Sequence, residues 1–320
     1  MASLLFNMTS PNRIHLAPYS PAKLLGKHIL TQVSPRTISI PGRRPQSTQA
    51  HLVTKASWTH PIYTTSELQS IQTAHRNAQD WSDKMALGTV RFLRWGMDLV
   101  TGYRHSQGRD VHSSRFRMTE QKWVTRFIFL ESVAGVPGMV AAMLRHLKSL
   151  RRMRRDYGWI ETLLEEAYNE RMHLLTFLKL SQPGPAMYFM VLAAQCVFFT
   201  GFSFAYLISP RICHRFVGYL EEEAVITYTK AIQELDKGNL PLWSDMEAPA
   251  MAIKYWQMPE GQRSIRSLLL NVRADEANHR DVNHTLGCLN QDSDPNPFSA
   301  KFKKALKDAS QPLAPAQDCR

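Results

Sequence analysis

Apolar side chains gather at helical spacing along four long stretches of the chain, at residues 119–148, 155–181, 211–237 and 260–288. Positions three or four residues apart share one face of an α-helix, so each stretch predicts a helix with an apolar face to bury. No stretch sustains the apolar–polar alternation of a strand, and no internal repeat is evident. The pattern therefore predicts an all-α fold in which four helices pack as a bundle.

A further amphipathic pattern precedes the bundle, at residues 77–103. Its apolar and aromatic positions are interleaved with Lys84, Arg91 and Arg94. Basic and aromatic residues along an apolar helix are typical of a helix that lies in a membrane surface. We therefore expect residues 67–118 to form an arm that contains a membrane-surface helix.

The basic charge of the chain is concentrated at its N-terminus. Lys and Arg number 39 against 27 Asp and Glu, a net charge of +12. Residues 1–66 hold seven of the basic residues, no acidic residue and many Ser, Thr and Pro, which leaves 32 basic against 27 acidic residues in the remainder. This composition predicts a mitochondrial or plastid transit peptide, with a disordered basic arm as the alternative. It does not indicate nucleic-acid binding. Residues 291–320 read as a polar tail.

The four cysteines predict neither a secreted disulfide scaffold nor a zinc site. They form no C-x-x-C pair and show no disulfide spacing. We expect each of them to be an unpaired thiol.

Two Glu-x-x-His steps are the strongest chemical signal. Glu170 precedes His173, and Glu276 precedes His279, each by three residues, so each pair shares one helix face. Two more glutamates lie in the other two apolar helices, Glu131 and Glu221. A di-iron or di-manganese four-helix bundle needs one Glu from each of two helices and Glu-x-x-His from each of the other two. Carboxylate oxygens with a few imidazoles suit Fe or Mn.

The surroundings of Glu131 support the metal interpretation. It lies within an apolar helical stretch, at residues 127–136, where no helix face offers solvent. A buried carboxylate is normally paired or metal-bound, because burying it alone costs many kcal/mol. A structural ion pair is the alternative.

Residues 186–208 contain no charged residue and are long enough to cross a bilayer. A crossing would place the helices that carry Glu170 and Glu221 on opposite sides of the membrane and would divide the metal set. Gln195, Thr200 and Ser203 also make the segment more polar than a typical span. We therefore predict a helix that packs on the bundle and enters one leaflet.

Four motifs resemble the alternative oxidases, the cyanide-insensitive mitochondrial ubiquinol oxidases. They are FLESVAGVPGM at 129–139, NERMHL at 169–174, LEEEA at 220–224 and RADEANHRDVNH at 273–284, within a resemblance that covers roughly residues 80–290. The resemblance implies a ferritin-like di-iron bundle with additional membrane-associated helices. It also implies the iron ligands, which would be Glu131, Glu170, His173, Glu221, Glu276 and His279.

Spacing alone leaves the triplet 221–223 ambiguous, because three consecutive helical residues point in three directions. The resemblance favours Glu221 as the ligand and Glu222 as a supporting or surface acid. Tyr228 lies two turns beyond Glu221 on the same face, where the family has a redox-relevant tyrosine. An ordinary buried tyrosine is the alternative.

The resemblance also implies a quinol pocket that opens to the membrane beside the irons. Helix–helix packing, with Arg126 as a structural ion-pair partner, is the alternative. Asp275 and Asn169 would hold the metal ligands in orientation. The residues that correspond to the lining of the pocket are Arg104, Arg126, Leu130, Leu220, Glu223, Ala224 and Thr227.

Two departures from the family pattern are visible. Ser132 replaces the threonine of the family's Leu-Glu-Thr, which keeps the hydroxyl. No cysteine precedes Cys196, whereas plant members carry a regulatory cysteine near the N-terminus, so the chain is more similar to the fungal or protist branch.

The activity that the resemblance implies is a terminal oxidase that pumps no protons, oxidises ubiquinol and reduces O₂ to water at two irons. It would lie on the matrix side of the mitochondrial inner membrane, in one leaflet, as a homodimer. A di-iron hydroxylase or desaturase and a plastid-type quinol oxidase are the alternatives among enzymes. A ferritin-like iron-binding membrane protein is the alternative without catalysis.

Overall fold

The computed structural model of the 320-residue chain describes residues 59–101, 118–300 and 302. They belong to the second of two units into which the chain divides, Met1–Lys55 and Ala56–Arg320. Within the described residues the secondary structure is helical, apart from one isolated bridge between Glu247 and Ser264. The all-α prediction is therefore confirmed for these residues. The helices are α1 Thr65–Ser70, α2 Trp81–Thr101, α3 Glu120–Arg152, α4 Trp159–Leu180, α5 Pro185–Ile208, α6 Pro210–Asp236, α7 Pro241–Ser244, α8 Ala250–Tyr255 and α9 Ile265–Leu286.

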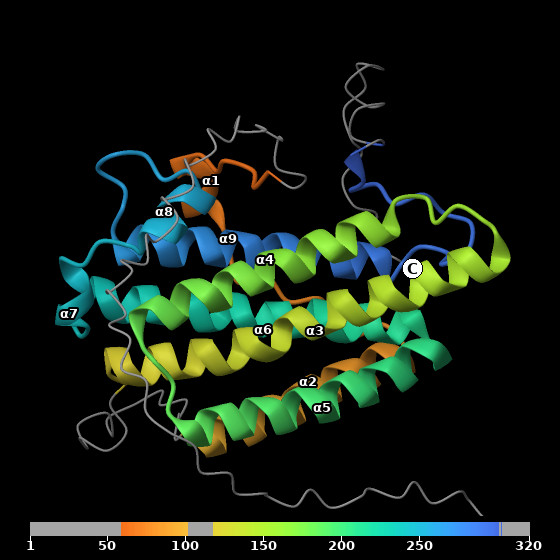
Figure 1. The fold of residues 1–320 in the computed structure, drawn as a ribbon, viewed down its shortest axis with the longest axis horizontal. Coiled ribbons are helices and arrows are strands. Elements are labelled where there is room, and N and C mark those ends of the chain that lie inside the picture. The colour runs from red at the N-terminus through yellow and green to blue at the C-terminus, as the bar shows by residue number, and fades with distance from the viewer. Residues whose placement is uncertain (1–58, 102–117, 301, 303–320) are drawn as a thin grey trace, which may run out of the picture. The chain divides into compact units, whose positions relative to one another are not determined.

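The four long helices α3, α4, α6 and α9 form the predicted bundle (Figure 1), in which α3 packs on α4 and α6 packs on α9. Their bounds differ from the expected ones where local chemistry sets the ends. Helix α3 continues to Arg152 and stops at Met153, whose left-handed backbone (φ 48°) caps it. Helix α9 begins five residues later than expected, because the Ser264 side chain accepts a hydrogen bond from the Ser267 N–H and caps it.

Two glycines allow the helix pairs to approach closely. A Cβ atom on Gly138 of α3 would lie 2.7 Å from the Leu163 carbonyl oxygen of α4. A Cβ atom on Gly218 of α6 would lie 2.5 Å from the His284 ring of α9. Both distances are far below van der Waals contact, so any larger residue would push the helices of each pair apart.

The buried apolar residues form two clusters that lie at different heights along the four bundle helices. The first contains Phe127 of α3, Phe177 of α4 and Tyr228 of α6, together with the N-terminal half of α9. The second contains Val140 of α3 and Leu163 of α4, together with the N-terminal half of α6 and the C-terminal end of α9. On every helix the predicted metal ligands fall between the two clusters.

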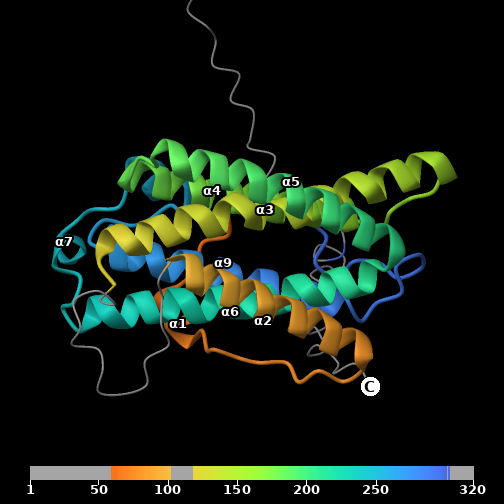
Figure 2. The ribbon, with the colours of Figure 1, turned by 90° about the horizontal axis from the view of Figure 1, so that it is seen from below.

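Helices α2 and α5 lie on the same side of the bundle (Figure 1), and Figure 2 views the molecule from that side. Helix α5 packs on α3 and α6, and α2 packs on α6. Helices α3 and α5 are both long and apolar enough to cross a membrane, but α3 belongs to the bundle core, whereas α5 is largely uncovered. The exposed large apolar side chains of α2 and α5 are Trp81, Met85, Phe92, Leu93, Trp95, Leu99, Tyr188, Phe189, Leu192, Val197, Phe199, Phe204, Leu207 and Ile208.

Residues 1–66 are predicted to be a transit peptide or, alternatively, a disordered arm, and this stays a prediction. Of this range the structure describes residues 59–66, where His60 and Tyr63 contact Asp275 of α9. The prediction of unpaired thiols holds for Cys196 and Cys213. It is wrong for Cys288, which is disulfide-bonded.

Candidate metal centre

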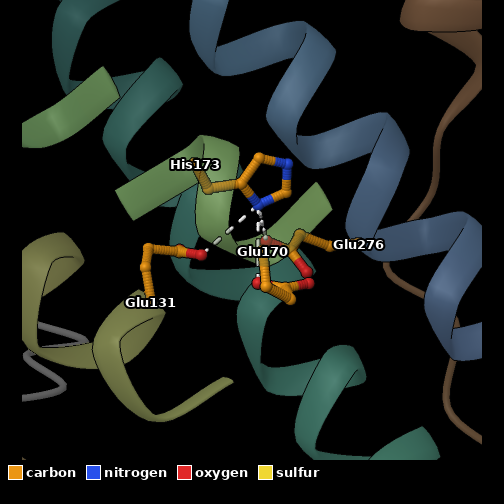
Figure 3. A group of neighbouring side chains, drawn as sticks. All are labelled: Glu131, Glu170, His173 and Glu276. Atoms are coloured by element: carbon orange, nitrogen blue, oxygen red, sulfur yellow. Dashed lines mark ion pairs between the residues drawn. The ribbon is translucent and has the colours of Figure 1, made fainter. Parts of the chain in front are cut away.

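Side chains from three bundle helices converge between the two apolar clusters (Figure 3). Glu131 comes from α3, Glu170 and His173 from α4, and Glu276 from α9. One nitrogen or oxygen atom of each lies within 4.8 Å of the corresponding atoms of the other three, and all four residues are buried. The predicted Glu-x-x-His step on α4 therefore faces the interior of the bundle together with two of the other predicted ligands.

His173 lies at the middle of this group. Its Nδ1 atom is 3.3 Å from Glu131 Oε2, 3.5 Å from Glu170 Oε2 and 3.3 Å from Glu276 Oε1. The second histidine, His279 of α9, extends the group, with its Nδ1 atom 2.7 Å from Glu170 Oε1 and 3.7 Å from Glu276 Oε2. Both rings therefore present the same nitrogen to the carboxylates.

Glu221 of α6 belongs to the same cluster. It is buried, and burial raises the pKa of its carboxyl well above the usual value. The neighbouring charges of Glu276 and Glu170 and a hydrogen bond with Glu276 raise this pKa further. All six predicted ligands thus lie in one buried group, although their role as metal ligands stays a prediction.

The group has the properties of a metal site. Several of its buried atoms contact one another as ion pairs but form no well-directed hydrogen bond with any described residue: Glu131 Oε2, both carboxylate oxygens of Glu170, His173 Nδ1, Glu276 Oε2 and His279 Nδ1. Such atoms are costly to bury unless something binds them. Metal dications would bind them, and a set of carboxylates with two imidazoles suits Fe or Mn.

The carboxyl and imidazole groups of this site shift the pKa values of one another. Burial raises the pKa of Glu131 well above its usual value, and the charges of Glu276 and Glu170 add to the effect. Burial lowers the pKa of His173, but Glu170 and Asp275 outweigh it, and the pKa is raised well above the usual value. His173 and His279 lower the pKa of Glu170 below its usual value, so the carboxyl and imidazole groups of the site depend on one another for their ionisation.

Asp275 supports His173 from outside the group. Its carboxylate lies 3.1 Å from His173 Nε2, the nitrogen that faces away from the cluster. A carboxylate on the second nitrogen of a metal-binding histidine fixes the orientation of the ring. Asn169 donates to the same carboxylate at 3.1 Å, so both residues predicted to orient the ligands contact one another.

Three partners of Asp275 were not predicted. Tyr63 donates to it at 2.7 Å, Trp256 donates at 2.9 Å, and His60 Nε2 lies at 2.8 Å. His60 and Tyr63 are three residues apart, a spacing that could have marked them, but they lie in the stretch whose composition predicted a disordered arm.

Tyr228 is buried and donates its hydroxyl proton to Glu131 Oε1. Its ring stacks on Phe127 and Phe177, with centroids 4.7 and 6.1 Å away. Burial and the charge of Glu131 raise the pKa of the hydroxyl well above its usual value, so the proton stays on Tyr228. The expected tyrosine beside the site is therefore present, bonded to a predicted ligand.

The predicted quinol-pocket residues are only partly brought together. Arg104 lies outside the described residues. Arg126 is buried and donates to Asp98 at 2.7 Å. Glu223 forms an ion pair with Arg94, which also lies 3.6 Å from Asp98.

The arginine that meets Glu223 is therefore Arg94 of α2, and Asp98 links it to Arg126 of α3. Neither Arg94 nor Asp98 was predicted for this side of the site, although they lie four residues apart on an amphipathic helix and therefore share one face of it. Leu220 packs at the edge of the second apolar cluster, and the Thr227 hydroxyl donates to the Glu223 carbonyl oxygen at 2.8 Å. Leu130 and Ala224 are half-buried.

Glu222 does not join the metal group. Its carboxylate is bonded on the other side of α6, to His75 Nδ1 at 2.6 Å, the Arg76 N–H at 2.9 Å and His284 Nε2 at 2.9 Å. The prediction that Glu221, rather than Glu222, faces the cluster agrees with this geometry.

Comparison with known proteins gives one consistent answer. Residues 63–288 match the sequence model of the family described as "Alternative oxidase". The mitochondrial alternative oxidase of Aspergillus niger is 67% identical over 264 residues, which cover 82% of this chain and 75% of that protein. Those of Emericella nidulans and Ajellomyces capsulatus are 64% and 63% identical, over 79% and 81% of this chain and 72% and 73% of their own lengths. The chain therefore belongs to the alternative oxidase family.

Proposed function

We propose that this chain oxidises ubiquinol and reduces O₂ to water at a di-iron carboxylate centre, as a cyanide-insensitive terminal oxidase that pumps no protons. The convergence of the glutamates and histidines of four bundle helices carries the proposal. Membership of the alternative oxidase family supports the class of oxidoreductase. The donor set supports iron.

Six residues would hold the two irons: Glu131, Glu170, His173, Glu221, Glu276 and His279. When bound, the di-iron pair would pass electrons from quinol to O₂, with two quinols providing the four electrons and four protons that convert one O₂ to two waters. The protein contributes the orientation of the ligands, through Asp275 on His173. It also excludes water, because all six residues are buried between two apolar clusters.

Tyr228 supplies a proton close to the reaction. Its hydroxyl donates a hydrogen bond to Glu131, one of the ligands, so its proton can move along this hydrogen bond without passing through solvent. On the side that faces α2, the Glu223–Arg94 and Arg126–Asp98 pairs offer a carboxylate and two guanidinium groups to a quinol head. The guanidinium groups would orient its hydroxyl oxygens, and the Glu223 carboxylate would accept a proton.

The apolar side of the molecule supports contact with a membrane. Helices α2 and α5 both expose aromatic side chains on the same side of the bundle. We propose that this side enters one leaflet, so that quinol reaches the site from the bilayer. Relatives are named mitochondrial, which supports a mitochondrial location. Within the mitochondrion, we propose the matrix side of the inner membrane. Protons would be taken up and released on one side, and the energy would appear as heat.

A second apolar surface supports a homodimer. Met139, Met143, Leu147 and Leu150 of α3 are all exposed and follow spacings of four, four and three residues, so they share one helix face. This face belongs to a bundle helix rather than to α2 or α5, and a second copy of the chain would cover it.

The test is O₂ consumption by the purified protein with a ubiquinol analogue in cyanide, together with iron quantification. Glu276→Ala removes a ligand from the centre of the group, so we expect loss of nearly all activity and of bound iron. Glu221→Ala should give the same result. Glu165→Ala is the matched control, because Glu165 is an exposed glutamate of α4, and it should keep both.

The alternatives predict different results. A hydroxylase or desaturase would incorporate oxygen into, or desaturate, a lipid instead of consuming O₂ with quinol alone. An iron-storage protein would bind iron without turnover. Full activity in an iron-free Glu276→Ala protein would show the ligand assignment to be wrong.

A further inference from the structure

A cavity lies on the face of α6 that points away from the metal group. Its volume is about 410 Å³. Three parts of the chain enclose it, namely α6, α2 and the extended segment between α1 and α2, which runs along α6 in Figure 2. The lining residues used here are Leu87 and Arg91 of α2, and Tyr219, Ile226, Thr229 and Lys230 of α6.

The two carboxylates of this cavity already have partners. Glu222 is bonded to His75, to the backbone of Arg76 and to His284. Glu223 is paired with Arg94. Both carboxylates are therefore already bonded within the protein.

Two cationic side chains line the same cavity, Arg91 of α2 and Lys230 of α6. Burial lowers the pKa of Lys230, the charges of Arg94 and Arg126 lower it further, and Asp98 raises it. A guanidinium and an ammonium in one cavity favour an anion.

Two hydroxyl groups complete the lining. The oxygen atoms of Tyr219 and Thr229 are buried, and neither has a hydrogen-bond partner among the described residues. Tyr219 as a whole is fully buried. Buried hydroxyl groups normally find a partner, so two in one cavity indicate that a ligand supplies it.

We propose that this cavity binds an organic phosphate. A phosphate group has three acceptor oxygens and up to two negative charges, which match a guanidinium, an ammonium and two hydroxyl donors better than a carboxylate does. The cavity is larger than a phosphate, and Leu87 and Ile226 provide apolar walls for the organic part. Because α2 also carries the apolar side proposed to enter the membrane, the phosphate can belong to a soluble metabolite or to a lipid headgroup.

The cavity shares Glu223 with the residues proposed to orient quinol. A ligand beside Glu223 would change the strength of the Glu223–Arg94 pair, and so the affinity for quinol. This consequence rests on the proposed function, whereas binding of the phosphate does not, so the two can fail separately.

The test is calorimetric titration of the full-length protein in detergent, with inorganic phosphate and with glycerol 3-phosphate. A parallel titration uses nanodiscs with and without phosphatidic acid, which separates a lipid headgroup from a soluble ligand. We expect binding to at least one probe. Arg91→Gln with Lys230→Gln removes both cations and should weaken it by about tenfold or more. Tyr219→Phe removes one donor without changing charge and should also weaken it.

Arg151→Gln with Lys179→Gln is the matched control, because it removes the same charges from exposed positions outside the cavity. It should bind as the unmodified protein does. The proposal fails if no probe binds, or if the control weakens binding as much as the cavity variant. Helical content by circular dichroism shows that each variant is folded, so loss of binding reports the cavity.

Discussion

Tyr228 has a polar and an apolar role in one side chain. Its hydroxyl is bonded to Glu131, whereas its ring lies in the apolar cluster between Phe127 and Phe177. The polar end therefore belongs to the site and the ring belongs to the core. A single substitution can separate these two roles.

We predict that Tyr228→Phe lowers quinol-dependent O₂ uptake by at least about tenfold. Losing a positioned proton donor typically costs about a hundredfold or more, so tenfold is the smallest effect that fits the proposed role. Bound iron should be unchanged, because Glu131 remains. Loss of one buried hydrogen bond should cost about 1 kcal/mol of unfolding free energy. Activity equal to that of the unmodified protein would show that the hydroxyl is only structural.

For single residues, the sequence predicts contacts between side chains that are close together along one helix. Glu170 and His173 are three residues apart, so their common face follows from helix geometry alone. His60 reaches Asp275 across 215 residues, and only the tertiary fold creates that contact. The resemblance implies Arg104 and Arg126 on the quinol side; Arg104 lies outside the described residues and stays a prediction, and Arg94, which the resemblance does not name, pairs with Glu223.

At the scale of the helices, close packing holds the predicted ligands at fixed positions. Gly138 lies seven residues beyond Glu131 on α3, where α3 crosses α4.

The helices themselves could be predicted from their apolar stripes. Their ends could not, because α3 stops at the left-handed Met153 and α9 starts at the Ser264 cap.

Gly138→Ala should lower the unfolding free energy by about 1–3 kcal/mol, since its Cβ atom would overlap the Leu163 carbonyl. Thermal unfolding in detergent measures this change. Gly201→Ala in α5 is the control, because a Cβ atom there meets nothing within 4 Å, and it should be neutral or slightly stabilising. Equal behaviour of the two variants would contradict the close approach.

His214 gives the α6–α9 pair a dependence on pH. It is buried between Tyr206 and Asn283, with ring nitrogens 3.3 and 3.0 Å from their oxygens. Burial lowers its pKa to about 4, so the folded state holds it neutral. The unfolded state binds the proton below about pH 6.5, so this contribution to stability is complete above pH 6.5 and is lost as pH falls towards 4.

We expect the unfolding free energy to fall by about 3 kcal/mol from this source between pH 6.5 and 4. His214→Gln cannot titrate and should have a flatter pH profile of melting temperature. His146→Gln, an exposed histidine of α3, should keep the original profile. Parallel profiles for all three proteins would contradict the role of His214.

At the scale of the whole folded unit, the exposed apolar residues fall into two groups with different proposed partners. Those of α2 and α5 belong to the two helices on one side of the bundle (Figure 1), whereas Met139, Met143, Leu147 and Leu150 share one face of the bundle helix α3. The amphipathic pattern of residues 77–103 predicted the first group. The second belongs to a core helix, whose sequence cannot show which of its apolar faces the fold leaves uncovered.

Phe92→Ser with Trp95→Ser should weaken binding to phospholipid vesicles by about tenfold or more, because two aromatic side chains lose their transfer into the bilayer. Sedimentation with vesicles measures this. Leu147→Ser with Leu150→Ser should leave vesicle binding unchanged and should shift the oligomeric state in detergent. Equal loss of vesicle binding in both variants would contradict two separate surfaces.

The contacts of His60 and Tyr63 with Asp275 limit how the chain can be matured. The predicted transit peptide would have to be cut upstream of His60, since a cut beyond Tyr63 would take away two partners of the carboxylate that contacts His173. We therefore predict that the place of this cut decides whether the His173 ring keeps its orientation.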